Sequence, residues 1–263
     1  RIIFAGDIVG HAGRRALNVI YPELNSSYKP DFFIVNGENA ACGLGITPNI
    51  AGSLFKMGID AVTLGNHTFS NRDFIGHIKE FPYVVRPANV SVDWPGRDYC
   101  IIEKNGLTLA VINLMGQVGF GDVHCDNPFV KADDLISMIR ASYKVNGIFV
   151  DFHAEATSEK CALGYYLDGR VTAVCGTHTH VQTSDEEILP KGTAYITDIG
   201  MCGAVYSVLG VKPEISIRRM KNKIPIKFEH DSCGPSKIEC AYFDIDEVTG
   251  KALGVKRLRF IFS

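Results

Sequence analysis

Residues 31–39 read Asp-Phe-Phe-Ile-Val-Asn-Gly-Glu-Asn, an unbroken apolar run that ends in a group of polar side chains. The same order of residues occurs at positions 2–7 and again at positions 61–67. Continuous rather than alternating hydrophobicity predicts strands that are covered on both faces, which is typical of parallel sheets. The N-terminal part of the chain is therefore expected to be α/β, built from three strand–loop–helix units.

Helical signals follow each of these three runs. Gly10 and Gly13 are expected in a tight loop that precedes the first helix. Thr47 and Pro48 are typical of a helix N-cap and of the first helical position. We expect these helices at residues 14–25, 48–57 and 72–79.

The rest of the chain shows a less regular order of strand, loop and helix signals. Asn105-Gly106 between two β-rich runs predicts a hairpin, at which the sheet turns antiparallel. Residues 116–131 form an aperiodic loop, in which His124 and Cys125 are read more simply as ordinary loop residues than as ligands, although the loop could cover a site. Residues 200–210 are expected to be irregular. Further strands are expected at 84–89, 99–103, 107–114, 147–153, 170–175, 194–199 and within 224–262, and further helices at 132–143 and near 157–163.

Composition bounds the class of protein. Of 263 residues, 46% are hydrophobic and 21% are charged, with a formal net charge of −2, so bulk binding of nucleic acid is not expected. No linker or repeat is visible, and residues 1–263 are expected to form a single domain. No apolar run approaches a membrane span, and the chain already reads as a strand at residues 1–4, so no leader segment is expected. The eight cysteines contain no C-x-x-C pair, which favours free thiols and a cytoplasmic location.

Polar side chains that can bind metals collect just after the predicted strands. Each of them alone has a simpler interpretation, such as a helix cap, a turn residue or a buried histidine. Together they supply enough oxygen and nitrogen atoms for two divalent ions at one edge of a sheet. If residues 174–180 continued as a strand, His178 and His180 would point to the same side. The candidates are Asp7, Glu38, Asn39, Asn66, His67, His153, His178 and His180.

The order of these motifs resembles a known family. Gly6-Asp7, Glu38-Asn39, Gly65-Asn66-His67, His153 and then Gly176-Thr177-His178-Thr179-His180 are similar to the calcineurin-type binuclear metallophosphoesterases, and to their bacterial YmdB-like branch in particular. The resemblance extends to residues 86–89, 156–160 and 190–198, and so covers essentially the whole chain. It implies an α/β fold of the metallophosphoesterase type, a four-layer αββα sandwich with mixed sheets.

The same resemblance implies roles for the residues. One metal would take Asp7, Glu38, Asn39 and His180, and the other Glu38, Asn66, His153 and His178, with Glu38 as the bridge. His67 would be the catalytic residue that protonates the leaving oxygen or stabilises the transition state. The family precedent favours iron or manganese, and zinc is acceptable for these ligands.

Three positions depart from the wider superfamily. Val9 stands where the first motif usually has histidine, and Glu38 takes the place of the usual bridging aspartate. Asn39 could replace the missing histidine. Thr68 stands where an acidic residue is common, so any contact that orients His67 must come from another residue.

The resemblance implies a phosphodiesterase that acts on small substrates, including 2′,3′- and 3′,5′-cyclic nucleotides, through a hydroxide that bridges the two metals. Two other functions stay open at this point: a metal-dependent phosphomonoesterase or nucleotidase, and a non-catalytic regulatory metal-binding module. The sequence leaves the oligomeric state open, a homo-oligomer included. A dinucleotide-binding site and a P-loop are disfavoured, because neither G-x-G-x-x-G nor G-K-[ST] is present.

Overall fold

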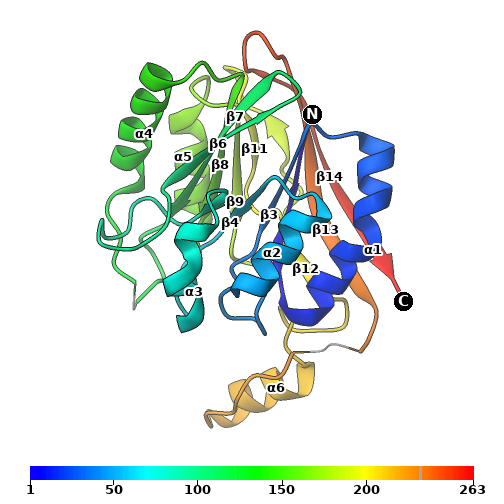
Figure 1. Cartoon of the computed structure of the whole chain (residues 1–263). Coiled ribbons are helices and arrows are strands. Elements are labelled where there is room, and N and C mark those ends of the chain that lie inside the picture. The colour runs from blue at the N-terminus through cyan, green and yellow to red at the C-terminus, as the bar shows by residue number, and fades with distance from the viewer. Residues whose placement is uncertain (122, 231–232) are drawn as a thin grey trace.

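Two β-sheets pack face to face in the computed structural model of the chain, and helices cover both outer faces (Figure 1). The structure describes residues 1–121, 123–230 and 233–263. The first sheet has the strand order β2-β12-β13-β1-β3-β4-β5, with β14 paired to β13. The second sheet has the order β10-β11-β9-β8-β7-β6. This is the four-layer αββα sandwich with mixed sheets that the resemblance implied.

The strands of the first sheet are β1 (Ile2–Ala5), β2 (Asp7–Ile8), β3 (Phe32–Asn36), β4 (Ala61–Thr63), β5 (Val84–Val85), β12 (Met201–Ala204), β13 (Ser236–Ile245) and β14 (Ala252–Phe262). Those of the second are β6 (Tyr99–Lys104), β7 (Leu107–Met115), β8 (Gly147–His153), β9 (Ala173–Thr177), β10 (Glu187–Ile188) and β11 (Ala194–Ile196). The helices are α1 (Gly10–Tyr28), α2 (Pro48–Met57), α3 (Arg72–His77), the short 3₁₀ turn η1 (Ile78–Glu80), α4 (Pro128–Ser142), α5 (Thr157–Leu167) and α6 (Pro213–Asn222).

The continuous apolar runs exist because each strand faces two cores. In β1, Ile3 packs into the core beneath α1, α2 and α3, whereas Ile2 and Phe4 pack into the core between the two sheets. In β8, Phe149 enters the core between the sheets, and Ile148 faces the third core beneath α4 and α5. Strand side chains alternate between faces, so only an unbroken apolar run can fill both cores.

Several expected elements are confirmed. Thr47 caps α2 and accepts a hydrogen bond from the backbone N–H of Ile50, with Pro48 at the first helical position. Strands β6 and β7 form the predicted antiparallel hairpin, and Asn105 and Gly106 have the positive φ values that its tight turn requires. This hairpin belongs to the second sheet, in which β7, β8, β9 and β11 then run parallel.

Other expectations about the positions of helices and strands were wrong. Helix α1 begins at Gly10, so Gly10 and Gly13 lie in the helix rather than in a loop before it. Gly13 is needed there because a Cβ atom would lie 2.2 Å from the backbone oxygen of Cys202, where α1 crosses β12. Strand β12 lies within the stretch expected to be irregular, and helix α6 was not expected at all. Residues 224–230, expected as strand, lie outside the named strands.

None of the helices in the described ranges is both long enough and apolar enough to cross a membrane.

The core between the two sheets should dominate the stability of the fold. The ring of Phe149 lies 5.1 Å from that of Phe4 and 5.7 Å from that of Phe243, and it is fully buried. We expect Phe149→Ala to lower the free energy of unfolding by about 3–5 kcal/mol, because it leaves a cavity that the sheets cannot close. Urea unfolding followed by circular dichroism measures this loss. Val19→Ala on the exposed face of α1 is the control, and an equal loss in both variants would contradict the role of this core.

Candidate metal centre

The side chains predicted as ligands come together where both sheets end. Asp7 lies in β2, and Glu38, Asn39 and Asn66 follow β3 and β4, so the first sheet supplies these four. The second sheet supplies the three histidines, at the end of β8 and after β9. The set Asp7, Glu38, Asn39, Asn66, His153, His178 and His180 forms one network of contacts.

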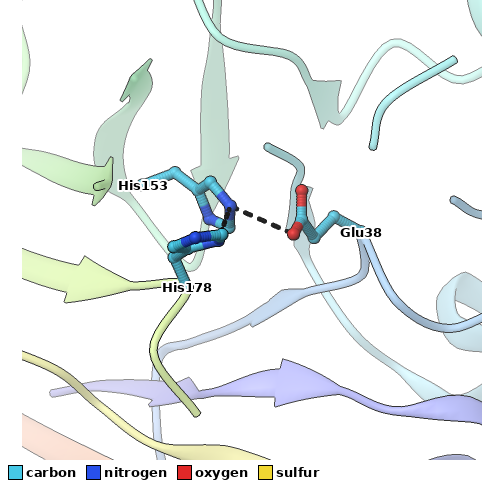
Figure 2. Close-up of side chains that lie close together, drawn as sticks. All are labelled: Glu38, His153 and His178. Atoms are coloured by element: carbon cyan, nitrogen blue, oxygen red, sulfur yellow. Dashed lines mark hydrogen bonds and ion pairs between the residues drawn. The ribbon is translucent and has the colours of Figure 1, made fainter. Parts of the chain in front are cut away.

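The first group in this network surrounds the ring of His153. Its Nε2 lies 3.0 Å from Glu38 Oε1, 3.0 Å from Asn66 Oδ1 and 3.1 Å from Nδ1 of His178. Figure 2 shows the two histidine rings close together, with the carboxylate of Glu38 facing them. Glu38, His153 and His178 offer ligand atoms that all lie within 4.8 Å of one another.

A buried hydrogen-bond chain fixes the tautomer of His153. The hydroxyl of Thr177 donates to Asp151 Oδ1 at 2.7 Å, so it can only accept from Nδ1 of His153, which lies 2.8 Å away. Burial raises the pKa of Asp151 to about 6, which leaves it ionised at neutral pH and able to accept. In the neutral ring, with the Nδ1 proton so placed, Nε2 carries a lone pair that faces the acceptor atoms of Glu38, Asn66 and His178. A position surrounded only by lone pairs suits a cation.

The acid–base properties of Glu38 and His153 also indicate a place for positive charge between them. Burial disfavours the charge on Glu38, but the neighbouring His153 outweighs it and lowers the pKa of the carboxyl to about 2. Burial also opposes the charge on His153, and Glu38 nevertheless raises the pKa of the imidazole to about 9. A proton on Nε2 and a metal ion at the same place are alternative ways of supplying positive charge, so the two compete there.

The second group surrounds His180 in the same manner. Nδ1 of His180 lies 3.3 Å from the backbone oxygen of Leu209, to which it donates. Its Nε2 then faces Asn39 Oδ1 at 3.0 Å and Asp7 Oδ1 at 3.8 Å, and both of these atoms are acceptors. Asn39 is held in this orientation because its Nδ2 donates to the backbone oxygen of Gly43.

Asp7 gives the clearest sign that a cation belongs here. Its side chain is fully buried, and Oδ1 has no hydrogen-bond partner among the described residues. Burial raises the pKa of this carboxyl well above its ordinary value, because nothing nearby compensates the charge enough. Gly65 leaves the space that ligands need, since a Cβ atom there would lie 2.1 Å from Glu38 Oε2 and 2.5 Å from His153 Nε2. The donor set and this space both fit two metal ions.

The two histidines after β9 do not reach the site in the way that strand alternation predicted. Strand β9 ends at Thr177, and His178 and His180 have φ values of 97° and 62°. The chain therefore turns sharply at both residues, and the two imidazoles enter different groups. The expectation of a shared side was wrong because it assumed that the strand continued.

Asp198 holds this turn in place. One of its oxygens, Oδ2, accepts from both the backbone N–H and the hydroxyl of Thr179, the residue between the histidines. The same oxygen pairs with Nζ of Lys160 at 2.7 Å, and both charged groups are buried. His178 is also bound from outside, since its Nε2 lies 3.1 Å from Glu155 Oε2. These contacts orient the candidate ligands, although none of Asp198, Lys160 and Glu155 was predicted as a site residue.

His67 lies beside this network without belonging to either group of acceptors. Its backbone N–H donates to Glu38 Oε2 at 3.1 Å, and its Nδ1 lies 3.1 Å from the hydroxyl of Ser70. Ser70 therefore supplies the orienting contact that Thr68 cannot. His67 lines a cleft of about 1110 Å³ that is also lined by Glu38, His178 and His180.

The loop after β7 contributes one side chain that sequence reasoning missed. The ring of Phe120 lies 4.8 Å from that of His178 and 5.9 Å from that of His153, so this part of the loop packs over the histidines. His124 is exposed and takes no part in the network, and Cys125 donates to backbone oxygens. Residue 122 of this loop lies outside the described residues.

The sequence did contain a signal for Asp151, which was not predicted as a site residue. A carboxylate within an otherwise apolar strand must find its hydrogen-bond partners inside the protein.

Comparison with known proteins identifies a family, a relative and two solved structures to which the chain is similar. Residues 3–258 match the model of a family described as YmdB-like protein. A 2′,3′-cyclic-nucleotide 2′-phosphodiesterase of Bacillus subtilis (strain 168) is 48% identical over 258 residues, which are 98% of this chain and 96% of the relative. The crystal structure of a phosphatase from Mycoplasma pneumoniae superposes with a TM-score of 0.92 at 35% identity, over 99% of this chain and 92% of that one. The crystal structure of a hypothetical protein from Thermus thermophilus superposes with a TM-score of 0.90, also at 35% identity, over 99% of this chain and 98% of that one.

The hydroxyl of Thr177 should matter for metal affinity although it touches no candidate metal position. Thr177→Val removes the acceptor of the His153 Nδ1 proton, so the ring loses its fixed tautomer and orientation. We expect the affinity for Mn²⁺ to fall by roughly 10- to 100-fold, as measured by calorimetric titration of metal-free protein. Thr177→Ser keeps the hydroxyl and should bind as the wild type does. Equal affinities for the valine and serine variants would contradict the assigned hydrogen-bond chain.

Proposed function

The chain belongs to the YmdB-like family, and from that membership and the geometry above we propose that it is a dinuclear metal-dependent phosphodiesterase. Its substrates are small phosphodiesters, namely 2′,3′- and/or 3′,5′-cyclic nucleotides. The observation that carries this proposal is the presence of two groups of acceptor atoms, one around Nε2 of His153 that includes Glu38, and one around Nε2 of His180 that includes Asp7. The name of the Bacillus relative, which is 48% identical, supports the 2′,3′-cyclic class.

The ligand roles that we propose are those implied by the resemblance to the family, and the two groups of contacts support them. Asp7, Asn39 and His180 would hold one metal, and Asn66, His153 and His178 the other, with Glu38 shared. The set contains no thiolate, so iron, manganese and zinc all suit it, and the resemblance to the family favours iron or manganese. When bound, such a metal pair lowers the pKa of water and neutralises charge on the phosphate.

The reaction requires one proton to be delivered to the leaving group. Attack of water on phosphorus forms one P–O bond and breaks the bond to a ribose oxygen, which must then gain a proton. His67 is the candidate donor, because its ring lines the cleft beside Glu38 and is oriented through Ser70. Phe120 covers His153 and His178 on one side and limits the access of bulk water to them.

A phosphomonoesterase or nucleotidase is the second candidate, because the similar structure from Mycoplasma pneumoniae is described as a phosphatase. The same metal pair could serve either reaction, so the arrangement of ligands does not choose between them. The choice depends on whether the cleft accepts a diester.

The single domain and the cytoplasmic location stay predictions from the sequence.

Substrate class can be tested directly on purified protein whose metal content has been measured. We expect two metal ions per chain, hydrolysis of 2′,3′-cyclic AMP, and faster release from bis-p-nitrophenyl phosphate than from p-nitrophenyl phosphate. Glu38→Gln should abolish turnover, because an uncharged amide cannot be shared between two cations as the carboxylate can. Preference for the monoester would overturn the phosphodiesterase assignment. Full activity of Glu38→Gln with metal still bound would remove Glu38 from the bridging role.

The role of His67 can be tested by changing the leaving group. A ribose oxygen needs a proton as it leaves, whereas p-nitrophenolate does not. We expect His67→Ala to slow hydrolysis of 2′,3′-cyclic AMP by roughly 10²- to 10⁴-fold, with a much smaller loss on bis-p-nitrophenyl phosphate. Ser70→Ala, which only loosens the ring, should give a smaller loss of the same kind. Equal losses of His67→Ala on both substrates would point to binding rather than proton transfer.

A further inference from the structure

A basic segment stands at one end of the molecule and was not accounted for by the phosphodiesterase chemistry. It comprises residues 212–229, that is α6 and the stretch that follows it, and we call it the basic arm. Figure 1 shows α6 standing away from the two sheets and from the other helices. The arm has six basic and two acidic side chains, a net charge of +4, so the rest of the chain must carry −6 to give the total of −2. The basic residues are Lys212, Arg218, Arg219, Lys221, Lys223 and Lys227.

Most of this charge is not used within the chain. Arg218, Lys221, Lys223 and Lys227 are exposed, and among the described residues none of them takes part in an ion pair. Neighbouring like charges repel one another, and this repulsion destabilises the arm when no anion is bound to it. A surface of this kind is complementary to a polyanion.

The arm is continuous with the metal centre. Lys212, Met220, Lys227 and Phe228 line the same cleft as Glu38 and the two histidines after β9. The cleft measures about 1110 Å³, whereas pockets for one drug-sized ligand measure roughly 300–1,000 Å³. The cleft is therefore larger than the usual pocket for one such ligand, and the basic arm forms part of its wall.

The arm also offers an aromatic surface. The side chain of Phe228 is 46% exposed, and the guanidinium of Arg219 lies 4.3 Å from the centre of its ring. Exposed aromatic rings beside arginine and lysine are typical of sites for single-stranded nucleic acid, where bases stack and phosphates pair with cations. This combination distinguishes the arm from a surface that is merely charged.

A free cyclic nucleotide makes little use of such an arm. It carries one negative charge, on the phosphate that the metal centre itself would bind. A 2′,3′-cyclic phosphate forms only on ribose, and in an oligoribonucleotide it stands at the 3′ end, with the other phosphates extending away from it. With this terminal phosphate at the metal centre, the preceding phosphates would run toward the arm.

We propose that the basic arm binds the backbone of a single-stranded oligoribonucleotide, so that the metal centre opens the 2′,3′-cyclic phosphate at its 3′ end. The chemistry is the hydrolysis already described: water adds to phosphorus, one bond to a ribose oxygen breaks, and a terminal monoester remains. This inference rests on the proposed phosphodiesterase function. The whole-chain charge of −2 is consistent with it, because the arm alone carries a local net charge of +4.

The test compares a free and a chain-terminal cyclic phosphate. The substrates are 2′,3′-cyclic AMP and a ten-nucleotide adenosine oligoribonucleotide that ends in the same group, both assayed with the metal-loaded full chain at 50 and 200 mM salt. We expect kcat/KM for the oligonucleotide to be at least tenfold higher at 50 mM salt. If three phosphates are bound, it should fall by about 18-fold between the two salt concentrations. The rate with 2′,3′-cyclic AMP should change little.

The variant combines Arg218→Gln, Lys221→Gln and Lys223→Gln, none of which lines the cleft. It should reduce kcat/KM for the oligonucleotide to that of the free nucleotide and remove most of the salt dependence. The matched control carries Lys79→Gln, Lys144→Gln and Lys256→Gln, three exposed positions outside the arm and the cleft, and should behave as the wild type does.

Failure of this inference and failure of the proposed function give different results. If neither substrate is hydrolysed by the metal-loaded protein, the phosphodiesterase function fails, and the inference with it. If both are hydrolysed with equal kcat/KM and equal salt dependence, the function stands and the inference is overturned. A change in the oligomeric state of the triple variant, measured by sedimentation, would then identify a second copy of the chain as the occupant of the arm. Binding to anionic vesicles that is lost in the triple variant would instead identify a membrane surface.

Discussion

The geometry of the metal centre depends on one buried carboxylate, that of Asp198. It accepts hydrogen bonds from the backbone and the hydroxyl of Thr179, and it pairs with the buried ammonium of Lys160. The two histidines on either side of Thr179 have positive φ values, which residues other than glycine rarely adopt and which cost of order 1–3 kcal/mol each. The contacts of Asp198 offset that strain. Removal of either buried charge would leave the other without a partner, which is strongly destabilising, so the turn has few alternative conformations.

A second constraint is that neither sheet carries a complete site. The carboxylates and amides come from the first sheet and the loops after its strands, and the histidines come from the second. Glu38 of the first and His153 of the second meet only because the two sheets pack through the core that contains Phe4 and Phe149. The apolar core between the sheets is therefore the scaffold that sets ligand distances. The stability of the fold and the affinity for metal should consequently vary together when that core is changed.

Much of the fold and the identity of the candidate ligands could be predicted from the sequence, because both depend on local patterns. Apolar runs at residues 2–5, 32–35 and 148–150 indicated strands with two covered faces, and the polar residues that follow such strands lie at the edge of the sheets where the candidate ligands meet. The turn at His178 and His180 was not predictable, because it depends on Asp198. That residue lies about 20 residues further along the chain, in the loop that follows β11. Helix α6 was missed for a different reason: it is short and polar, and Ser216 is the only one of its residues that is buried, so it contributes little to the apolar cores from which the other helices were recognised.

Whole-chain composition also conceals how charge is arranged in space. A net charge of −2 argues against a protein that holds nucleic acid over its general surface, and the chain outside the basic arm is acidic overall. Charges act over about a Debye length, roughly 8 Å at physiological salt. Local density along the path of a substrate therefore decides what binds there, and the sum over the chain does not. The local excess of positive charge in the arm would therefore favour the approach of a polyanion along it. The same distribution would thus both attract a nucleotide chain and orient it, with its end directed into the cleft that holds Glu38 and the histidines.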